Sequence, residues 1–232
     1  MILTCVAVGD HLYIWRYDRQ GAIQCSALNP IQELPRFLVL LLVMERFEDR
    51  HWGLNARVDP NFGELPKPPS NSPVSTTMYI DDPEKGKVDL TLNWSSDKRV
   101  SHYGLNGRAT NVYPTTSVAL GSTEKLVVKL FWGEETRTSE AEILRKVYEI
   151  AEMEPDVKNH VPVMVFSYSF LDSSTATIRT RLGLPIEGAR ILYLIVFREL
   201  TQITKLDGVE FLSCWWDAVK CVSLPILGMN TI

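Results

Sequence analysis

Lys129 stands in the middle of an apolar run, residues 126–132, which reads LVVKLFW. Such a run predicts a strand that is buried on both faces. A buried ammonium group needs an anion beside it to offset its lost hydration, either a carboxylate or the phosphates of a ligand. We therefore expect a carboxylate or the phosphates of a ligand beside Lys129. An edge strand whose lysine points at water is the alternative, and the local sequence leaves it open.

A helix predicted over residues 139–153, closed by Pro155, supplies the carboxylate. Its apolar stripe centres near Val147 and consists of Ile143, Leu144, Val147, Ile150 and Ala151. At about 100° per residue, Glu140 lies about 20° from that centre and Glu142 about 140° away. Helix geometry therefore selects Glu140, which points inward, as the partner of Lys129.

A second role for Glu140 remains open at this point. An acid in the first turn is favourable to the helix dipole, and Thr138 would then be the N-cap residue. The two roles are compatible with each other.

The segments before and after this lysine and helix add weaker signals. Residues 107–113 stand where a phosphate-covering loop would lie, and Gly107 and Val112 match the pattern GxGxxGxV in register. Leu105 and Thr110 occupy its other glycine positions, so a simple β-turn explains the segment equally well. Downstream, an apolar strand over residues 191–197 leads into Arg198-Glu199-Leu200-Thr201, whose backbone could bind a flat base. An ordinary buried strand followed by an exposed connection is the alternative.

The remaining elements form an α+β pattern. The first fifty residues predict a β-meander, strands 3–8, 12–17 and 22–26, followed by a buried helix over the apolar residues 37–47 with Pro35 in its first turn. Further strands are predicted at 78–80, 88–94, 103–105, 111–113, 125–132 and 161–168, and a final helix at 209–222 that stops by Pro225. Residues 55–75 are rich in proline and read as a spacer rather than a proline-rich docking motif. We expect one body in which the meander extends the main antiparallel sheet.

Composition bounds the function classes. A net charge of −4 gives no electrostatic case for nucleic acid or an acidic membrane as a partner. The longest apolar run, residues 37–44, is far short of the roughly 20 residues that span a bilayer, and no basic leader precedes the apolar start. The cysteines at 5, 25, 214 and 221 show no CxxC spacing, so reduced thiols and no zinc are expected. These features predict an intracellular protein, cytoplasmic or nuclear.

Taken together, five stretches resemble the fungal-type protein kinase family, a branch of the protein-kinase-like fold. They are residues 13–21, 107–112, 127–132, 137–140 and 198–200, and the likeness runs from about residue 3 to 221. The resemblance implies a kinase-like N-lobe, an antiparallel sheet plus one key helix, with an N-terminal β-meander and helix extension and only the start of the C-lobe. The implied divisions are an extension at 1–54, a loop or linker at 55–76, the N-lobe at 77–200 and a tail at 201–232.

The resemblance also implies a site and a cofactor. ATP, with Mg²⁺, would be the cofactor of a Ser/Thr-type protein phosphotransferase. Glu140 would pair with the phosphate-binding lysine. The implied ATP-binding residues are Gly107, Arg108, Ala109, Thr110, Val112, Lys129, Glu199 and Leu200.

The sequence departs from the family after the final predicted helix. Kinases need an aspartate in an HRD-type loop, an asparagine and a metal-binding aspartate. Here the residues after Cys221 read VSLPILGMNTI. We therefore assign no catalytic residue and no metal ligand, and expect a chain cut before the catalytic loop, by a gene-model break or an alternative exon, that is inactive in isolation. The alternatives are a pseudokinase-like scaffold and a fragment without function. The scaffold would contact a protein partner through the final helix, using Phe211, Leu212, Trp215 and Trp216.

Overall fold

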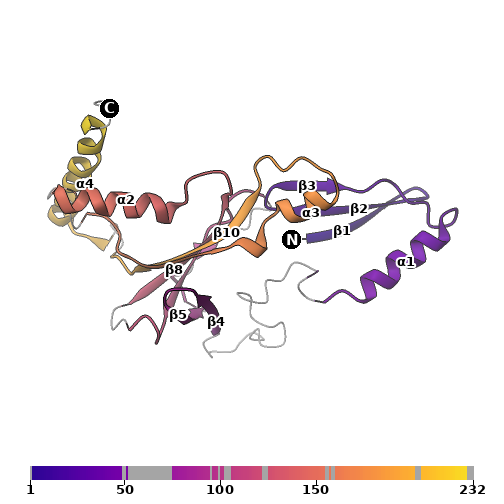
Figure 1. Cartoon of the computed structure of the whole chain (residues 1–232), viewed down its shortest axis with the longest axis horizontal. Coiled ribbons are helices and arrows are strands. Elements are labelled where there is room, and N and C mark those ends of the chain that lie inside the picture. Colours follow the sequence, from indigo (N-terminus) through magenta and orange to yellow (C-terminus); the bar gives the residue numbers. More distant parts are fainter. Residues whose placement is uncertain are drawn as a thin grey trace.

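The computed structural model describes residues 2–48, 51, 75–94, 96–98, 100–101, 106–121, 125–154, 157, 160–201 and 205–228. Almost all of the proline-rich segment 55–76, and the strand expected at 103–105, lie outside these residues. The described part contains two antiparallel sheets and a few helices (Figure 1), which confirms the predicted α+β class.

The N-terminal sheet is the predicted meander. It consists of β1 (Ile2–Val8), β2 (His11–Asp18) and β3 (Gly21–Gln24), in that order and all antiparallel. The expectation that it extends the main sheet is wrong, because in the described ranges no strand pairing joins the two sheets. The turn between β2 and β3 instead contacts the main body through side chains and one backbone hydrogen bond. Gln20, for example, donates from Nε2 to the carbonyl oxygen of Glu187 at 2.8 Å.

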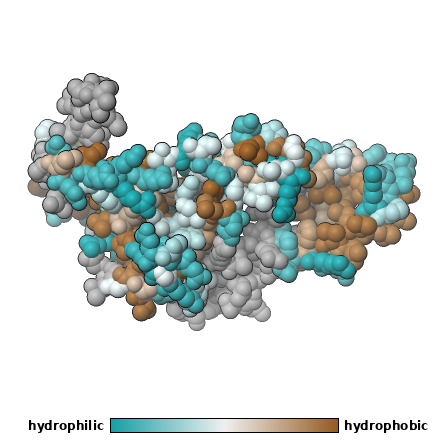
Figure 2. Space-filling model, in the orientation of Figure 1, coloured by the Kyte–Doolittle hydropathy of each residue, from teal (hydrophilic) through white to brown (hydrophobic). Residues whose placement is uncertain are grey.

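The helix α1 (Leu34–Glu45) follows the meander and begins with Pro35 in its first turn, as predicted. The expectation that it is buried is wrong, because none of its residues is buried. Leu38 and Val39, for example, are 55% and 59% exposed. The helix extends away from the main body beside the meander (Figure 1), so its apolar side chains form a hydrophobic surface there (Figure 2).

The main sheet has the strand order β4-β5-β7-β8-β10-β9, and β6 also pairs with β7. β6 pairs with the beginning of β7 at Asn111 and Val112, whereas β5 pairs with its end at Thr115 and Thr116. The strands are β4 (Ser75–Asp82), β5 (Gly86–Asn93), β6 (Val100–Ser101), β7 (Asn111–Thr116), β8 (Leu126–Glu134), β9 (Met164–Phe170) and β10 (Arg190–Arg198).

The main sheet curls so that its first and last strands approach each other. Lys85, in the turn between β4 and β5, donates from Nζ to the carbonyl oxygen of Val165 in β9 at 3.0 Å. The hairpin of β4 and β5 therefore closes over one face of the sheet, and the core lies beneath it. The predicted alternation in β5 is confirmed, since Val88, Leu90 and Leu92 are at most 1% exposed. The buried members of this core are Met78, Ile80, Val88, Leu90, Leu92, Tyr113, Leu126, Val128, Leu130, Phe166, Phe170, Leu192, Leu194 and Val196.

The helix α2 (Glu140–Met153) covers the other face of β8 and β10. Ala141 packs there with Phe131 and Ile195. The hydroxyl group of Tyr148 also ties the helix to the start of β9, because it donates to the Pro162 carbonyl at 2.6 Å and accepts from the Met164 amide at 2.7 Å.

The start of α2 differs from the prediction in one residue. Ser139, not Thr138, is the N-cap: its hydroxyl accepts from the Glu142 amide, and the Glu142 carboxylate accepts from the Ser139 amide. This reciprocal arrangement is a capping box. The sequence contains its signature, Ser-x-x-Glu, at residues 139–142, and this signature distinguishes Ser139 from Thr138 as the N-cap residue.

The buried side of α2 is also rotated relative to the expected stripe. Ile143 is 49% exposed, whereas Ala141 and Ala151 are buried. The stripe therefore centres near Leu144, from which Glu140 lies about 40° and Glu142 about 160° away. The choice of Glu140 as the inward carboxylate survives this correction.

In the described residues of the C-terminal third, two helices are present besides a short 3₁₀ turn at Leu171–Ser173. The six-residue α3 (Ala176–Arg181) was not predicted, because a helix this short leaves no periodic apolar pattern. The last helix, α4 (Gly208–Gly228), continues past Pro225, which was expected to stop it. A proline near a helix end removes a single i→i−4 hydrogen bond, and here the helix continues for three more residues. Among the described residues, no helix has the length and apolar character needed to cross a membrane.

Candidate functional site

Lys129 lies in the interior of the main sheet. Its strand, β8, is paired with β7 on one side and β10 on the other, so the edge-strand alternative is wrong. Val112 in β7 and Ile195 in β10 stand directly opposite Lys129. Residues opposite each other in a ladder share a face of the sheet, so all three lie on the face that α2 covers. The Lys129 side chain retains 28% exposure, enough for a ligand to reach it.

The structure brings Lys129 and Glu140 together. The ammonium nitrogen of Lys129 donates to both carboxylate oxygens of Glu140, at 2.7 and 2.6 Å. It also lies 5.0 Å from the centre of the Phe131 ring. Because an ammonium group has three N–H donors, one donor remains after the two bonds to Glu140. The lysine is thus held from two sides while one donor can still bind a further anion.

An apolar surface continues from Lys129 along the same face. Val127 precedes it by two residues in β8 and stands opposite Phe197 in β10, while Val100 stands opposite Val112. Side chains two residues apart in a strand point to the same side. Val100, Val112, Val127 and Phe197 therefore form one apolar surface that ends at the ion pair.

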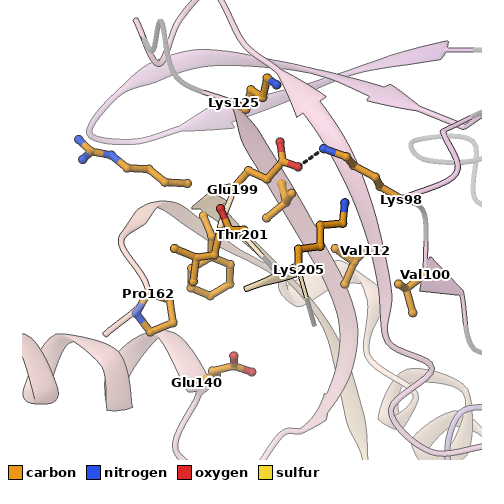
Figure 3. A pocket seen from close by; sticks show the side chains of 13 residues that line it. Lys98, Val100, Val112, Lys125, Glu140, Pro162, Glu199, Thr201 and Lys205 are labelled. Atoms are coloured by element: carbon orange, nitrogen blue, oxygen red, sulfur yellow. Dashed lines mark hydrogen bonds and ion pairs between the residues drawn. The ribbon is translucent and has the colours of Figure 1, made fainter. Parts of the chain in front are cut away.

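A pocket of about 630 Å³ opens over this surface (Figure 3). Its size is within the range of small-molecule sites. The four apolar residues line it, together with Glu140 and the segment after β10 from Arg198 to Thr201. In Figure 3, Glu140 lies at the opposite end of the pocket from Lys125.

The lining of the pocket is rich in basic side chains. They are Lys98, Lys125, Arg198 and Lys205. Lys98 forms an ion pair with Glu199, drawn as a dashed line in Figure 3. The hydrogen bond from Lys98 to Glu199, and the charge of that carboxylate, raise the pKa of Lys98. The lysine is therefore held in its charged form in the pocket lining.

The segment after β10 is tied down by its backbone. The Arg198 amide donates to the Val163 carbonyl at 3.0 Å, and the Glu199 amide donates to the Lys125 carbonyl at 2.8 Å. The Glu199 amide is therefore already engaged. Of the two residues predicted to bind a nucleotide here, Leu200 offers its amide beyond this tie and Glu199 its carbonyl; both residues line the pocket.

The predicted phosphate-covering loop lies beside the pocket rather than in its wall. Of its residues Val112 lines the pocket, and Gly107, Arg108, Ala109 and Thr110 do not. The Trp132 amide donates to the Arg108 carbonyl at 2.7 Å, which holds the loop against the far end of β8. Leu105 lies outside the described residues.

Several residues that line the pocket were not predicted from the sequence. Val127 and Phe197 are the main ones, and the available signal was the period of two along β8 and β10 that places Val127 beside Lys129. Lys98 and Lys205 carried no such signal, because loops bring them to the pocket. Among the described residues no cluster of three or more His, Cys, Asp or Glu side chains is suited to a metal ion.

The four residues of the final helix that were expected to meet a partner are exposed. Phe211, Leu212, Trp215 and Trp216 are 40%, 61%, 51% and 55% exposed. They lie on α4, outside the pocket.

A family model described as fungal protein kinase matches residues 2–188, most of the chain. No curated protein and no solved structure matches. The matched range includes the meander, Lys129 and Glu140, and ends before β10.

Proposed function

The chain belongs to the fungal protein kinase family, and from this premise we propose that it binds ATP in the pocket over β7, β8 and β10. The observation that carries the proposal is the two-oxygen contact between Lys129 and Glu140 at the end of the apolar surface. In protein kinases, a strand lysine paired with a helix glutamate contacts the α- and β-phosphates.

Each part of the pocket suits one part of the nucleotide. The apolar side chains of Val112, Val127 and Phe197 offer contact area for a flat base, whose edge would meet the backbone of Glu199 and Leu200. Lys129 does not itself line the pocket, but it is paired with Glu140, which does. Its remaining donor would bind a phosphate oxygen that extends past Glu140.

The charges around the pocket favour a polyphosphate. Although the chain carries a net charge of −4, four basic side chains line the pocket against two carboxylates, Glu140 and Glu199. This excess of positive over negative side chains attracts ligands of negative charge. A bound Mg²⁺ would neutralise part of the phosphate charge, and we assign none of its ligands to the described residues.

A thermal-shift titration with Mg-ATP tests the proposal. The unchanged protein is expected to be stabilised, by about 2.7 kcal/mol at a nucleotide concentration 100 times the Kd. Lys129→Ala is expected to lose most of this shift. Lys146→Ala, which removes an exposed lysine from α2, serves as the matched control and should keep it. The proposal fails if ATP does not stabilise the unchanged protein, or if it stabilises Lys129→Ala equally.

A second candidate function is binding of a partner protein through α4. Leu212, Trp215 and Val219 repeat at helical spacing and are 61%, 51% and 40% exposed, and such apolar stripes commonly mark interaction surfaces. A photo-crosslinking amino acid at position 212 should give a defined adduct in cell extract that the same probe at position 146 does not give. Identical adduct patterns at the two positions would rule this candidate out.

A further inference from the structure

The turn between β2 and β3 touches the loop that would cover the nucleotide. The amide of Gly107 donates to the carbonyl oxygen of Arg19 at 3.0 Å. The two residues are far apart in the sequence; Arg19 lies in a turn of the N-terminal sheet, and Gly107 lies in the loop before β7 of the main sheet. This backbone hydrogen bond is therefore a direct connection from the N-terminal sheet to the proposed nucleotide site.

Gln20, the next residue in the turn, is held through both polar atoms of its side-chain amide. Its Nε2 donates to the Glu187 carbonyl at 2.8 Å, and its Oε1 accepts from the Thr175 hydroxyl at 2.9 Å. The same hydroxyl accepts from the Arg190 amide at 2.9 Å, at the first residue of β10. Thr175 is only 6% exposed, so the two hydrogen bonds of its hydroxyl are partly sheltered from water, whereas the bond from Gln20 to Glu187 is exposed.

Asp18 holds the turn in shape. One carboxylate oxygen, Oδ1, accepts from the amides of Gln20 and Gly21 at 2.9 and 3.1 Å. It also forms an ion pair with Arg179 of α3 at 3.4 Å, and the two side chains are only 5% and 12% exposed. The other carboxylate oxygen of Asp18 and the Nε of Arg179 are buried without a hydrogen-bond partner among the described residues. Asp18 therefore holds the turn in shape through the contacts of Oδ1.

The loop itself adopts a conformation that needs support. Ala109 has a φ of +41°, a left-handed conformation that costs a residue other than glycine roughly 1–2 kcal/mol. Ala109 is only 7% exposed, so its surroundings enclose it in this conformation. Support comes from β8, where Trp132 bonds to Arg108, and from the β2–β3 turn, where Arg19 bonds to Gly107. Strain of this kind persists only when the surroundings over-determine it.

We propose that Gln20 and Thr175 are positioning residues that fix the nucleotide-covering loop through the β2–β3 turn. The affinity for ATP then depends on the N-terminal meander, although no residue of the meander lines the pocket. This inference rests on the proposed function. It extends that function to a sheet whose strands precede the nucleotide site in the chain.

Two variants and one conservative control test the inference. Thr175→Val removes the hydroxyl while keeping the shape of the side chain, and Gln20→Ala removes the bridge from the other side. Thr175→Ser keeps the hydroxyl and should behave like the unchanged protein. Hydrogen exchange of the peptide covering residues 106–113 reports the hold on the loop without any nucleotide. A peptide from β4 and β5 reports global stability.

The two loss variants are expected to raise the exchange rate at Gly107 and to weaken ATP binding, each by about threefold to tenfold, the effect of losing one hydrogen bond. Exchange in β4 and β5 should stay unchanged. Unaltered exchange at Gly107 in both variants would overturn the positioning role, as would faster exchange with unaltered ATP affinity. If the unchanged protein does not bind ATP, the proposed function is overturned instead. The exchange rate at Gly107 in the variants then tests, without ATP, whether Gln20 and Thr175 fix the loop.

Discussion

Lys129 shows how a single charged side chain depends on its partner. Glu140 accepts hydrogen bonds from two of the three N–H donors of Lys129, and it lies at the end of the pocket. Glu142, two residues away, is committed to the capping box with Ser139. The two carboxylates on one helical turn therefore have separate structural roles.

Glu140→Gln should accordingly weaken ATP binding by about tenfold, since a charge-assisted pair is lost and Lys129 is free to swing away. Glu142→Gln should leave the affinity unchanged, because glutamine also serves at that position of a capping box. Isothermal titration with Mg-ATP measures both. Equal losses in the two variants would contradict the assignment of Glu140 as the partner of the lysine.

A second single residue, Asp89, should make the stability of the fold depend on pH. The amides of Ala119 and Val118 donate to its carboxylate at 2.9 and 3.1 Å, and these hydrogen bonds lower its pKa. A carboxyl group with a lowered pKa in the folded state stabilises the fold above its unfolded value, about 3.9, and this contribution is lost as the pH falls through the folded pKa.

Asp89→Asn should therefore lower the free energy of unfolding at pH 7 by on the order of 1 kcal/mol. The difference between the two proteins should shrink below about pH 4, where the aspartate becomes protonated. Urea denaturation at pH 7 and pH 3 measures this. A difference that stays constant with pH would show that the charge of Asp89 is not involved.

At the scale of elements, the cap of α2 decides where the helix begins and so where Glu140 points. Ser139→Ala should cost about 1 kcal/mol in the free energy of unfolding, a typical loss for an N-cap serine. Thr138→Ala, at the neighbouring position first expected to be the cap, should cost much less. Urea denaturation of both variants at neutral pH decides between the two positions.

Gly133 in β8 packs closely against the ring of Tyr193 in β10. A Cβ atom at Gly133 would lie 2.7 and 2.9 Å from two ring carbons of Tyr193. That ring stacks on Phe131, with 5.5 Å between the ring centres, so it cannot move away without losing this contact. Gly133→Ala should destabilise the fold by about 1–3 kcal/mol, as overpacking does.

The matched control for Gly133→Ala is the same substitution in a Tyr193→Leu background, where most of the clash is absent. A double-mutant cycle should show coupling between positions 133 and 193. Additive effects would mean that the backbone at Gly133, rather than the ring, causes the loss.

The sequence predicted those elements whose signal is periodic. The alternation in β5, the apolar strand around Lys129 and the inward direction of Glu140 all follow from local spacing, and each agrees with the structure. The separate meander sheet, the position of the loop at Gly107 and the helix α3 did not follow from it. These depend on contacts between distant residues, such as Gln20 with Thr175 and Gly107 with Arg19, which no local pattern encodes.

On the scale of the whole molecule, burial and hydrophobicity do not coincide. The apolar composition of α1 predicted a core helix, yet none of its residues is buried. Leu194 of β10, by contrast, is fully buried. The stabilising core is therefore in the curled main sheet.

Replacing Leu38 by Glu and Leu42 by Lys should accordingly change the free energy of unfolding by no more than about 0.5 kcal/mol, since neither side chain is buried. The pair also has the favourable helical order of charges. Leu194→Ala should cost about 2–5 kcal/mol. Urea denaturation compares the two, and a large loss in the α1 variant would show that α1 is part of the stabilising core.

The contact between Lys85 and β9 has a consequence beyond the fold of one chain. Among the strands that the structure describes, β9 is the last in the sheet, so one side of its backbone has no partner strand among them. The carbonyl of Val165 on that side already accepts a hydrogen bond from the Lys85 ammonium, and Arg145 lies nearby on the hydroxyl of Ser167. A strand from another molecule would meet two positive charges where it needs free backbone groups. The lysine that closes the core therefore also disfavours the pairing of a foreign strand with the β9 edge.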